Sequence, residues 1–84
     1  MKVYAYGAVH EGTPLEILEQ LRRNLGDPDV TDFEGYTRHI QNVFFRFLGI
    51  PLDIPEELCL QDEKAAYLLE RVRRVGLLEV IEDA

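Results

Sequence analysis

The sequence is poor in several residue types, and each shortage excludes a class of protein. A single cysteine, Cys59, among 84 residues allows neither a disulfide within the chain nor a metal site built from several cysteines. No run approaches the roughly 20 apolar residues that a helix needs to span a bilayer. The first residues lack the long apolar core and the processing site of a signal peptide. We therefore expect a soluble cytoplasmic protein that makes no contact with membranes.

Motifs of catalysis and of cofactor binding are also missing. The two histidines, His10 and His39, lie apart in the sequence and form no H-E-x-x-H motif, and no glycine-rich phosphate loop is present. A lone cysteine such as Cys59 is usually a small buried hydrophobic residue rather than a nucleophile. The acidic residues between Asp27 and Glu34 lack the spacing and the central glycine of an EF-hand, and they suit the start of a helix better. We expect no enzymatic activity, no cofactor and no metal.

The composition that remains is that of a small acidic globular domain. Hydrophobic residues make up 46% of the chain and charged residues 30%, a balance typical of folded proteins. A chain of 84 residues has room for one hydrophobic core, so we predict a single domain over residues 1–84. The net charge of −7 repels phosphate over most of the surface.

Capping residues and apolar periodicity predict three helices, over residues 14–25, 31–48 and 62–75. Thr13 and Glu16 can form a capping box at the start of the first helix, and the stretch Thr31–Glu34 repeats this pattern at the start of the second. Each helix is followed by a glycine, the residue that most easily takes the left-handed conformation at a helix end. These glycines are Gly26, Gly49 and Gly76.

Two stretches have the β-branched and aromatic composition of strands, over residues 2–9 and 77–82, and Gly7 is a candidate bulge in the first. Two strands alone are marginally stable in water. We expect them to pair with each other across one face of the helices, or to complete a larger sheet across a dimer. The predicted fold is therefore α+β, in the order β-α-α-α-β, with three helices packed against a short two-stranded sheet.

The second predicted helix carries the clearest functional signal. No Asp or Glu occurs from Gly35 to Leu52, although the chain contains 16 acidic residues. Helical spacing groups its apolar side chains on one face, which contains Phe33, Tyr36, Ile40, Val43, Phe44 and Phe47. The far side combines basic, amide and aromatic residues, namely Arg38, Gln41, Asn42, Phe45 and Arg46. A large ring outside the apolar stripe is favoured at interfaces.

The same residues have an alternative role inside the fold. Arg38 and Arg46 could pair with acidic groups in residues 27–34 or 56–63, and Phe45 could contact the strands or the connector over residues 50–61. The third helix leaves the same choice open. Its residues Tyr67, Arg71 and Arg74 lie opposite the apolar stripe. This face is either a solvated face with an ion pair between Glu70 and Arg74, or an interface rich in Tyr and Arg.

We therefore predict a small binding or regulatory module that contacts another protein or a second copy of itself. The thin core and the open strand edges favour a homodimer. The predicted contact residues are Arg38, Gln41, Asn42, Phe45, Arg46, Tyr67, Arg71 and Arg74.

The alternative function is nucleic-acid binding. Residues 73–80 resemble the end of a winged-helix recognition helix as it enters the wing, and Phe45 with its polar neighbours could stack on a single-stranded base. Three features oppose this function. The connector over residues 50–61 is longer than the turn of a helix-turn-helix. Asp62 and Glu63, at the start of the third helix, would point their carboxylates into the major groove of DNA. The negative net charge of the chain repels the phosphate backbone. Nucleic acid is thus the less favoured partner.

Overall fold

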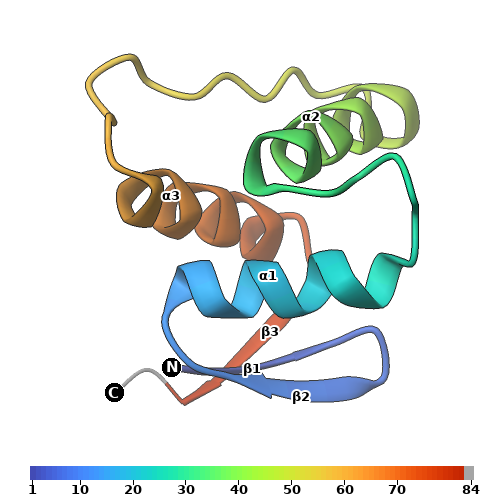
Figure 1. Cartoon of the computed structure of the whole chain (residues 1–84), viewed down its shortest axis with the longest axis vertical. Coiled ribbons are helices and arrows are strands. Elements are labelled where there is room, and N and C mark those ends of the chain that lie inside the picture. Colours follow the sequence, from blue (N-terminus) through green and yellow to red (C-terminus); the bar gives the residue numbers. More distant parts are fainter. Residues whose placement is uncertain (83–84) are drawn as a thin grey trace.

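The computed structural model describes residues 1–82 and shows an α+β fold in one compact globule. A three-stranded sheet forms one layer, α1 and α3 pack against each other above it, and α2 lies beyond them (Figure 1). The elements are β1 (Lys2–Ala5), β2 (Ala8–Glu11), α1 (Pro14–Leu25), α2 (Phe33–Val43), the π-helical segment η1 (Phe44–Leu48), α3 (Gln61–Arg74) and β3 (Glu79–Glu82). The predicted α+β class and its three helices are confirmed.

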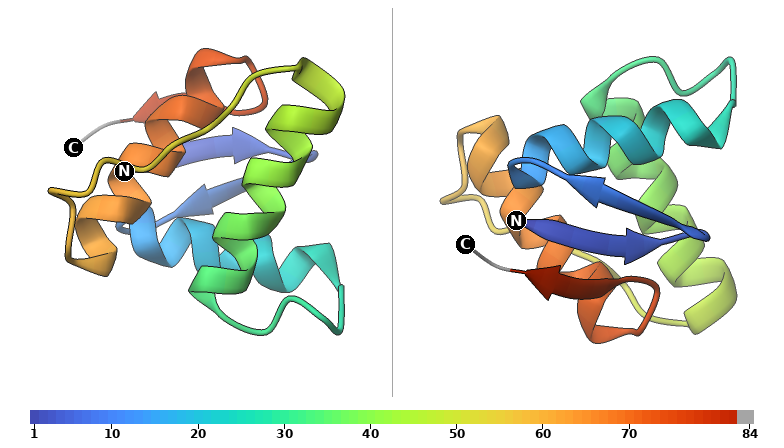
Figure 2. Two further views of the ribbon diagram at one scale, coloured as in Figure 1. Left: turned by 90° about the horizontal axis from the view of Figure 1, so that it is seen from above. Right: turned by 90° about the horizontal axis from the view of Figure 1, so that it is seen from below.

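The sheet is antiparallel and has the strand order β2-β1-β3. In the central strand, Val3 pairs with His10 on one side and with Val80 on the other. The first and last predicted strand segments therefore pair with each other, as expected. The helices cover only one face of this sheet, and its other face is open in the view from below (Figure 2).

The segment predicted as one strand over residues 2–9 instead folds into a hairpin, which adds a third strand. Tyr6 and Gly7 form a two-residue turn with φ of 53° and 79°. Two successive left-handed residues match the twist of the flanking strands, as in a type I′ turn. Asn-Gly is the usual sequence for such a turn, and Tyr-Gly lacks that signal. Gly7, predicted as a bulge, is therefore a turn residue.

The helix starts follow local capping chemistry. The backbone N–H of Glu16 donates to Thr13 Oγ1 at 3.2 Å, and the N–H of Thr13 donates back to Glu16 Oε1 at 3.1 Å, which confirms the predicted capping box. At the start of α2 the cap is Asp32 rather than Thr31. Asp32 Oδ1 accepts from the N–H of Gly35 at 2.7 Å and satisfies a donor at the free end of the helix.

The end of α2 departs from the predicted regular helix. Residues 44–48 are π-helical, and the N–H of Gly49 donates to the carbonyl of Phe44, five residues earlier. The wider turn changes which side chains share a face. Phe44 is fully buried, whereas the side chain of Phe47 is 79% exposed. The prediction that Phe47 belongs to the apolar face is wrong for this reason.

One polar side chain, His10, is buried between the sheet and α1 and is held by Gln20. Gln20 Nε2 donates to the carbonyl of Glu11 at 3.0 Å, so its Oε1 faces His10 Nδ1 at 3.2 Å. Because that oxygen can only accept, Nδ1 carries the hydrogen. His10 Nε2 is left buried with no partner among residues 1–82.

Gly76 provides a direct test of the way that α3 ends. It has φ of 84°, its N–H donates to the Arg73 carbonyl, and the N–H of Leu77 donates to the Val72 carbonyl, as in a Schellman motif. A Cβ at this position would meet no atom of the described residues beyond its chain neighbours within 4 Å, so backbone strain is what opposes an added Cβ. We expect Gly76→Val to lower the free energy of unfolding by about 1–2 kcal/mol.

Urea denaturation would measure this change. Gly76→Asn is the matched control and should lose less stability, because asparagine tolerates the left-handed conformation better than valine. An unchanged midpoint for Gly76→Val would contradict the assignment.

Candidate functional site

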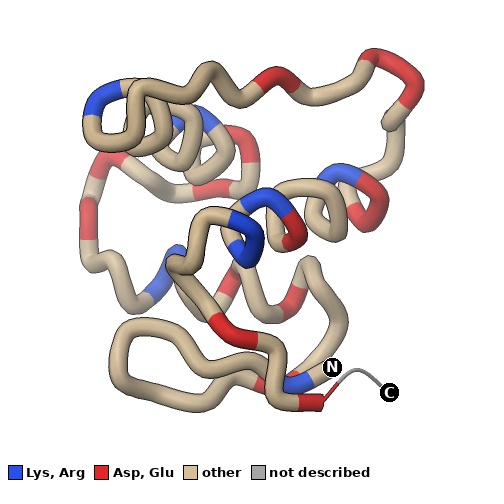
Figure 3. The backbone as a smooth tube through the Cα atoms, turned by 180° about the vertical axis from the view of Figure 1, so that it is seen from behind, with Lys and Arg blue, Asp and Glu red and all other residues tan. Residues whose placement is uncertain are grey.

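Four of the predicted contact residues are exposed along α2 and η1. Arg38, Asn42, Phe45 and Arg46 are all exposed, and we refer to these four residues as the α2 surface. The ring of Phe45 is 69% exposed. Asp and Glu are distributed over the connector and the loop before α2, whereas none occurs from Gly35 to Leu52 (Figure 3). The α2 surface is thus a basic and aromatic area on an acidic domain.

The arginines of the α2 surface form no ion pair with the carboxylates of residues 1–82. Within residues 1–82, ion pairs connect Lys2 with Glu82, Arg22 with Glu19, and Arg73 and Arg74 with Glu70. None of them includes Arg38 or Arg46. The alternative of internal pairing with residues 27–34 or 56–63 has no counterpart in this part of the chain.

Two further apolar side chains adjoin the α2 surface in sequence. Phe47 and Leu48 belong to η1 and are exposed, together with Phe45 and Arg46. Helical spacing predicted a buried Phe47, so sequence analysis missed its exposure. The run of Phe and Leu over residues 44–48 could have signalled more apolar side chains than one helix face can bury.

Gln41 and Tyr67 use their polar groups to hold the connector. Gln41 Nε2 donates to the carbonyl of Leu52 at 3.0 Å, and the hydroxyl of Tyr67 donates to the carbonyl of Asp53 at 2.9 Å. Both side chains are half-buried. These two members of the predicted contact set therefore help to position residues 50–60 across α2 and α3.

The arginines at the end of α3 form an ion-pair cluster around Glu70. Arg73 Nε donates to Glu70 Oε2 at 2.8 Å, and Arg74 Nε donates to Glu70 Oε1 at 3.3 Å. The predicted pair of Glu70 and Arg74 is thus present, with Arg73 as the closer partner. Arg71 is half-buried. The eight predicted residues therefore fall into two groups, one on α2 with η1 and one on α3.

This cluster has a testable consequence for acid stability. The hydrogen bonds from Arg73, followed by the charge of Arg73 and the contacts of Arg74, lower the pKa of Glu70 from 4.5 to about 2. A lowered pKa stabilises the fold above the unfolded value, and this contribution is lost as the pH falls from about 4.5 towards 2. We expect the Glu70 carboxyl carbon to titrate with a midpoint near 2 in NMR spectra.

The matched variant is Glu70→Gln, which should show a weaker decline of stability between pH 4.5 and 2 than the native chain. A Glu70 midpoint near 4.5 would show that the arginines do not hold this carboxylate.

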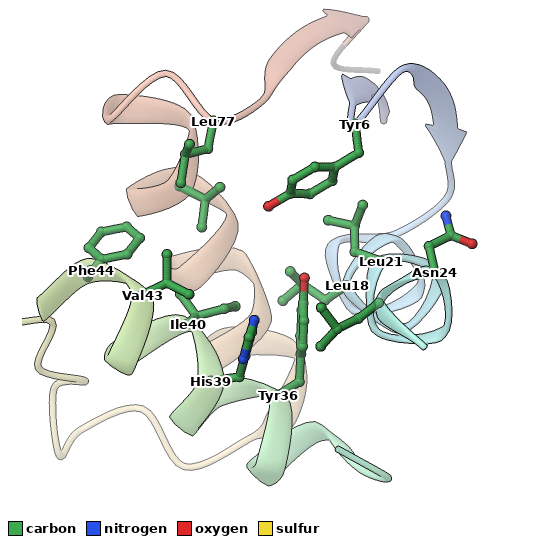
Figure 4. A pocket seen from close by; sticks show the side chains of 12 residues that line it. Tyr6, Leu18, Leu21, Asn24, Tyr36, His39, Ile40, Val43, Phe44 and Leu77 are labelled. Atoms are coloured by element: carbon green, nitrogen blue, oxygen red, sulfur yellow. The ribbon is translucent and has the colours of Figure 1, made fainter. Parts of the chain in front are cut away.

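A pocket of about 390 Å³ lies where the hairpin tip, α1, α2 and the end of α3 meet (Figure 4). Its walls are mostly aliphatic and aromatic, and in the part of the chain that the structure describes no Asp, Glu, Lys or Arg lines it. The lining residues are Tyr6, Leu18, Leu21, Asn24, Leu25, Tyr36, His39, Ile40, Val43, Phe44, Val72 and Leu77. Sequence analysis missed this pocket, because its walls come from four separate parts of the chain.

Tyr36 is the most buried polar side chain of the pocket, with 6% of its surface exposed. Burial raises the pKa of its hydroxyl above the usual range, and the nearby Tyr6 raises it further. Its ring stacks on that of His39, with centroids 6.0 Å apart and planes at 14°. Its hydroxyl makes no hydrogen bond within residues 1–82. His39 itself is half-buried and lines the pocket beside Tyr36.

Cys59 differs from the sequence-based expectation of a buried hydrophobic residue. It is exposed on the connector, which runs outside the helices and has Leu52 as its buried residue. Among the residues that the structure describes, no group of three or more His, Cys, Asp or Glu side chains gathers closely enough to hold a metal ion.

Comparisons of the chain with protein-family models, with curated proteins and with solved structures gave no match in any of the three. The helices found in residues 1–82 are all too short or too polar to cross a bilayer.

Proposed function

We propose that the protein is a binding module that contacts another protein through the α2 surface together with Phe47. The observation that carries this proposal is the exposure of two phenylalanine rings, Phe45 at 69% and Phe47 at 79%. Leaving such rings in water is unfavourable, and a partner that covers them gains the energy of apolar burial. Aromatic and arginine side chains are also the residues most often central to protein interfaces.

The charge around the two rings defines the chemistry of the partner. Arg38 and Arg46 lack ion-pair partners within residues 1–82, and the stretch from Gly35 to Leu52 has no carboxylate. A partner with an apolar centre and carboxylates at its rim complements this area. Because the rest of the domain is acidic, like-charge repulsion would disfavour other orientations of the same partner.

The double variant Arg38→Ala/Phe45→Ala tests this function. Both side chains are exposed, so we expect the free energy of unfolding to change by no more than about 0.5 kcal/mol per site. Affinity for the partner should fall by about 2 kcal/mol or more, because it loses an aromatic and an arginine anchor. The matched control Arg23→Ala/Leu60→Ala also removes one exposed arginine and one exposed apolar side chain, but away from α2.

The measurement begins with affinity capture from the source cell, using the native chain and both variants. A protein that the native chain and the control capture, but the Arg38→Ala/Phe45→Ala variant does not, is then purified. Its dissociation constant is measured with each of the three chains. An early-melting double variant would instead place Arg38 and Phe45 in the internal structure, and this result would overturn the proposal.

Two further experiments test whether the partner of this surface is a second copy of the chain or a nucleic acid. Sedimentation equilibrium at tens of micromolar, a range suited to weak association, should show a dimer that the double variant loses if the partner is a second copy. Binding of single-stranded oligonucleotides that weakens steeply with salt would favour the nucleic-acid alternative. A protein interface centred on aromatic side chains should depend much less on salt.

A further inference from the structure

The pocket between the hairpin tip and the three helices has the size and the walls of a small-molecule site. Its volume of about 390 Å³ lies within the range of roughly 300–1,000 Å³ found for ligand pockets. Leu18, Phe44 and Val72 line it and are at the same time buried residues of the hydrophobic core. The pocket is therefore preformed, since the packing of the core fixes its walls.

The lining residues define the polarity of the ligand. No Asp, Glu, Lys or Arg of residues 1–82 lines the pocket, so an ionised ligand would lose its hydration without gaining an ion pair from these residues. The polar side chains are those of Tyr6, Asn24, Tyr36 and His39. A neutral and mainly apolar molecule suits these walls best.

The hydroxyl of Tyr36 is a ready partner for such a molecule. It belongs to a side chain that is only 6% exposed, and it makes no hydrogen bond in residues 1–82. Among residues 1–82, His10 Nε2 is the buried side-chain atom left without a partner, so the Tyr36 oxygen itself keeps contact with the open space of the pocket. Figure 4 shows the hydroxyls of Tyr36 and Tyr6 directed into the same space between the helices and the hairpin. A ligand group placed there can donate to Tyr36 or accept from it.

The hairpin tip supplies a second and independent observation. Tyr6 has φ of 53°, a left-handed conformation that is strained for a residue with a bulky side chain. Its ring is 72% exposed, yet it lines the pocket. Backbone strain of this kind gathers at ligand sites, where it places a particular side chain. Here it places a phenol at the entrance to the pocket.

We propose that this pocket binds a neutral, mainly apolar small molecule with one hydrogen-bonding group, which docks on the Tyr36 hydroxyl and is covered by the ring of Tyr6. This site is separate from the α2 surface, so it stands or fails independently of the protein-binding function. Its ligand differs from the acidic partner of that surface in both size and charge.

The test is an NMR titration with three matched probes: 2-naphthol, naphthalene and 2-naphthoate. They share one ring system and differ in whether they carry a hydroxyl, no polar group or a negative charge. We expect 2-naphthol to bind most tightly and 2-naphthoate least tightly. Shift changes and intermolecular NOEs should appear at the methyl groups of Leu18, Val43 and Leu77, which line the pocket.

Three variants assign the contacts. Tyr36→Phe removes one hydroxyl and should weaken 2-naphthol binding about 2- to 12-fold, the range for one hydrogen bond, while naphthalene binding stays unchanged. Tyr4→Phe removes a hydroxyl from an exposed strand residue outside the pocket and is the matched control. Val43→Trp, on a half-buried lining position, should fill the pocket and abolish binding of 2-naphthol and naphthalene.

Several results would overturn the proposal. One is no binding of 2-naphthol up to its solubility limit. Another is shift changes centred on Phe45 and Phe47 instead of the pocket. A third is equal affinity for 2-naphthol in Tyr36→Phe and in the native chain. Thermal melting of each variant, compared with Tyr4→Phe, shows whether the fold is retained before affinities are compared.

Discussion

Replacing Phe44 by alanine should lower the free energy of unfolding by about 3–5 kcal/mol, whereas Phe47→Ala should change it by no more than about 0.5 kcal/mol. The two rings are three residues apart at the end of α2, yet Phe44 is fully buried and Phe47 is 79% exposed. The loss at Phe44 combines lost apolar transfer energy with the cavity left behind. This loss is a large fraction of the free energy of unfolding of a small domain, which is about 5–15 kcal/mol.

This comparison tests the π-helical segment directly. Urea denaturation of the two variants, with Phe45→Ala as a second exposed control, measures the difference under identical conditions. A regular α-helix through residue 48 would turn Phe47 towards the core. A loss of several kcal/mol in Phe47→Ala would therefore show that the helix continues without the wider turn.

Leu18→Ala should also lower the free energy of unfolding strongly, by about 2–5 kcal/mol. Leu18 is almost completely buried and lines the pocket, so its removal should extend the pocket into the core. Apolar cavities opened in this way accept aromatic molecules. We expect naphthalene to raise the melting temperature of Leu18→Ala, because the ring can occupy the enlarged space.

Leu68→Ala is the matched control for this experiment. Leu68 is also fully buried but does not line the pocket, so its cavity should be closed and too small for naphthalene. Its loss of stability should be similar, while naphthalene should raise its melting temperature less than that of Leu18→Ala. Equal stabilisation of the two variants would show that the space left by Leu18 does not join the pocket.

The features predictable from the sequence are those fixed by neighbouring residues. Thr13 and Glu16 lie three residues apart and supply both halves of a capping box, so the start of α1 follows from four residues of sequence. Gly26, Gly49 and Gly76 end their helices with positive φ for the same local reason. Helical spacing also placed Phe45 outside the apolar stripe, and its side chain in η1 is exposed.

The features that were missed depend on tertiary packing. Tyr6-Gly7 lacks the Asn-Gly signal of a two-residue turn, so the alternating pattern of residues 2–9 suggested one strand. The wider turn at Phe44 has no local sequence signature, and it moves Phe47 off the apolar face. The pocket requires side chains from four parts of the chain. No periodic pattern in one segment can predict such an arrangement.

The central position of β1 also determines the order in which the chain can fold. β2 follows β1 directly and can pair with it early, whereas Val80 of β3 reaches Val3 from the opposite end of the sequence. Closing a longer loop costs more entropy, although the cost grows slowly with length, and contacts distant in sequence slow folding. During synthesis, the edge of β1 that pairs with β3 therefore stays unpaired after the hairpin and α1 have been made. The sheet is completed only when β3 has left the ribosome.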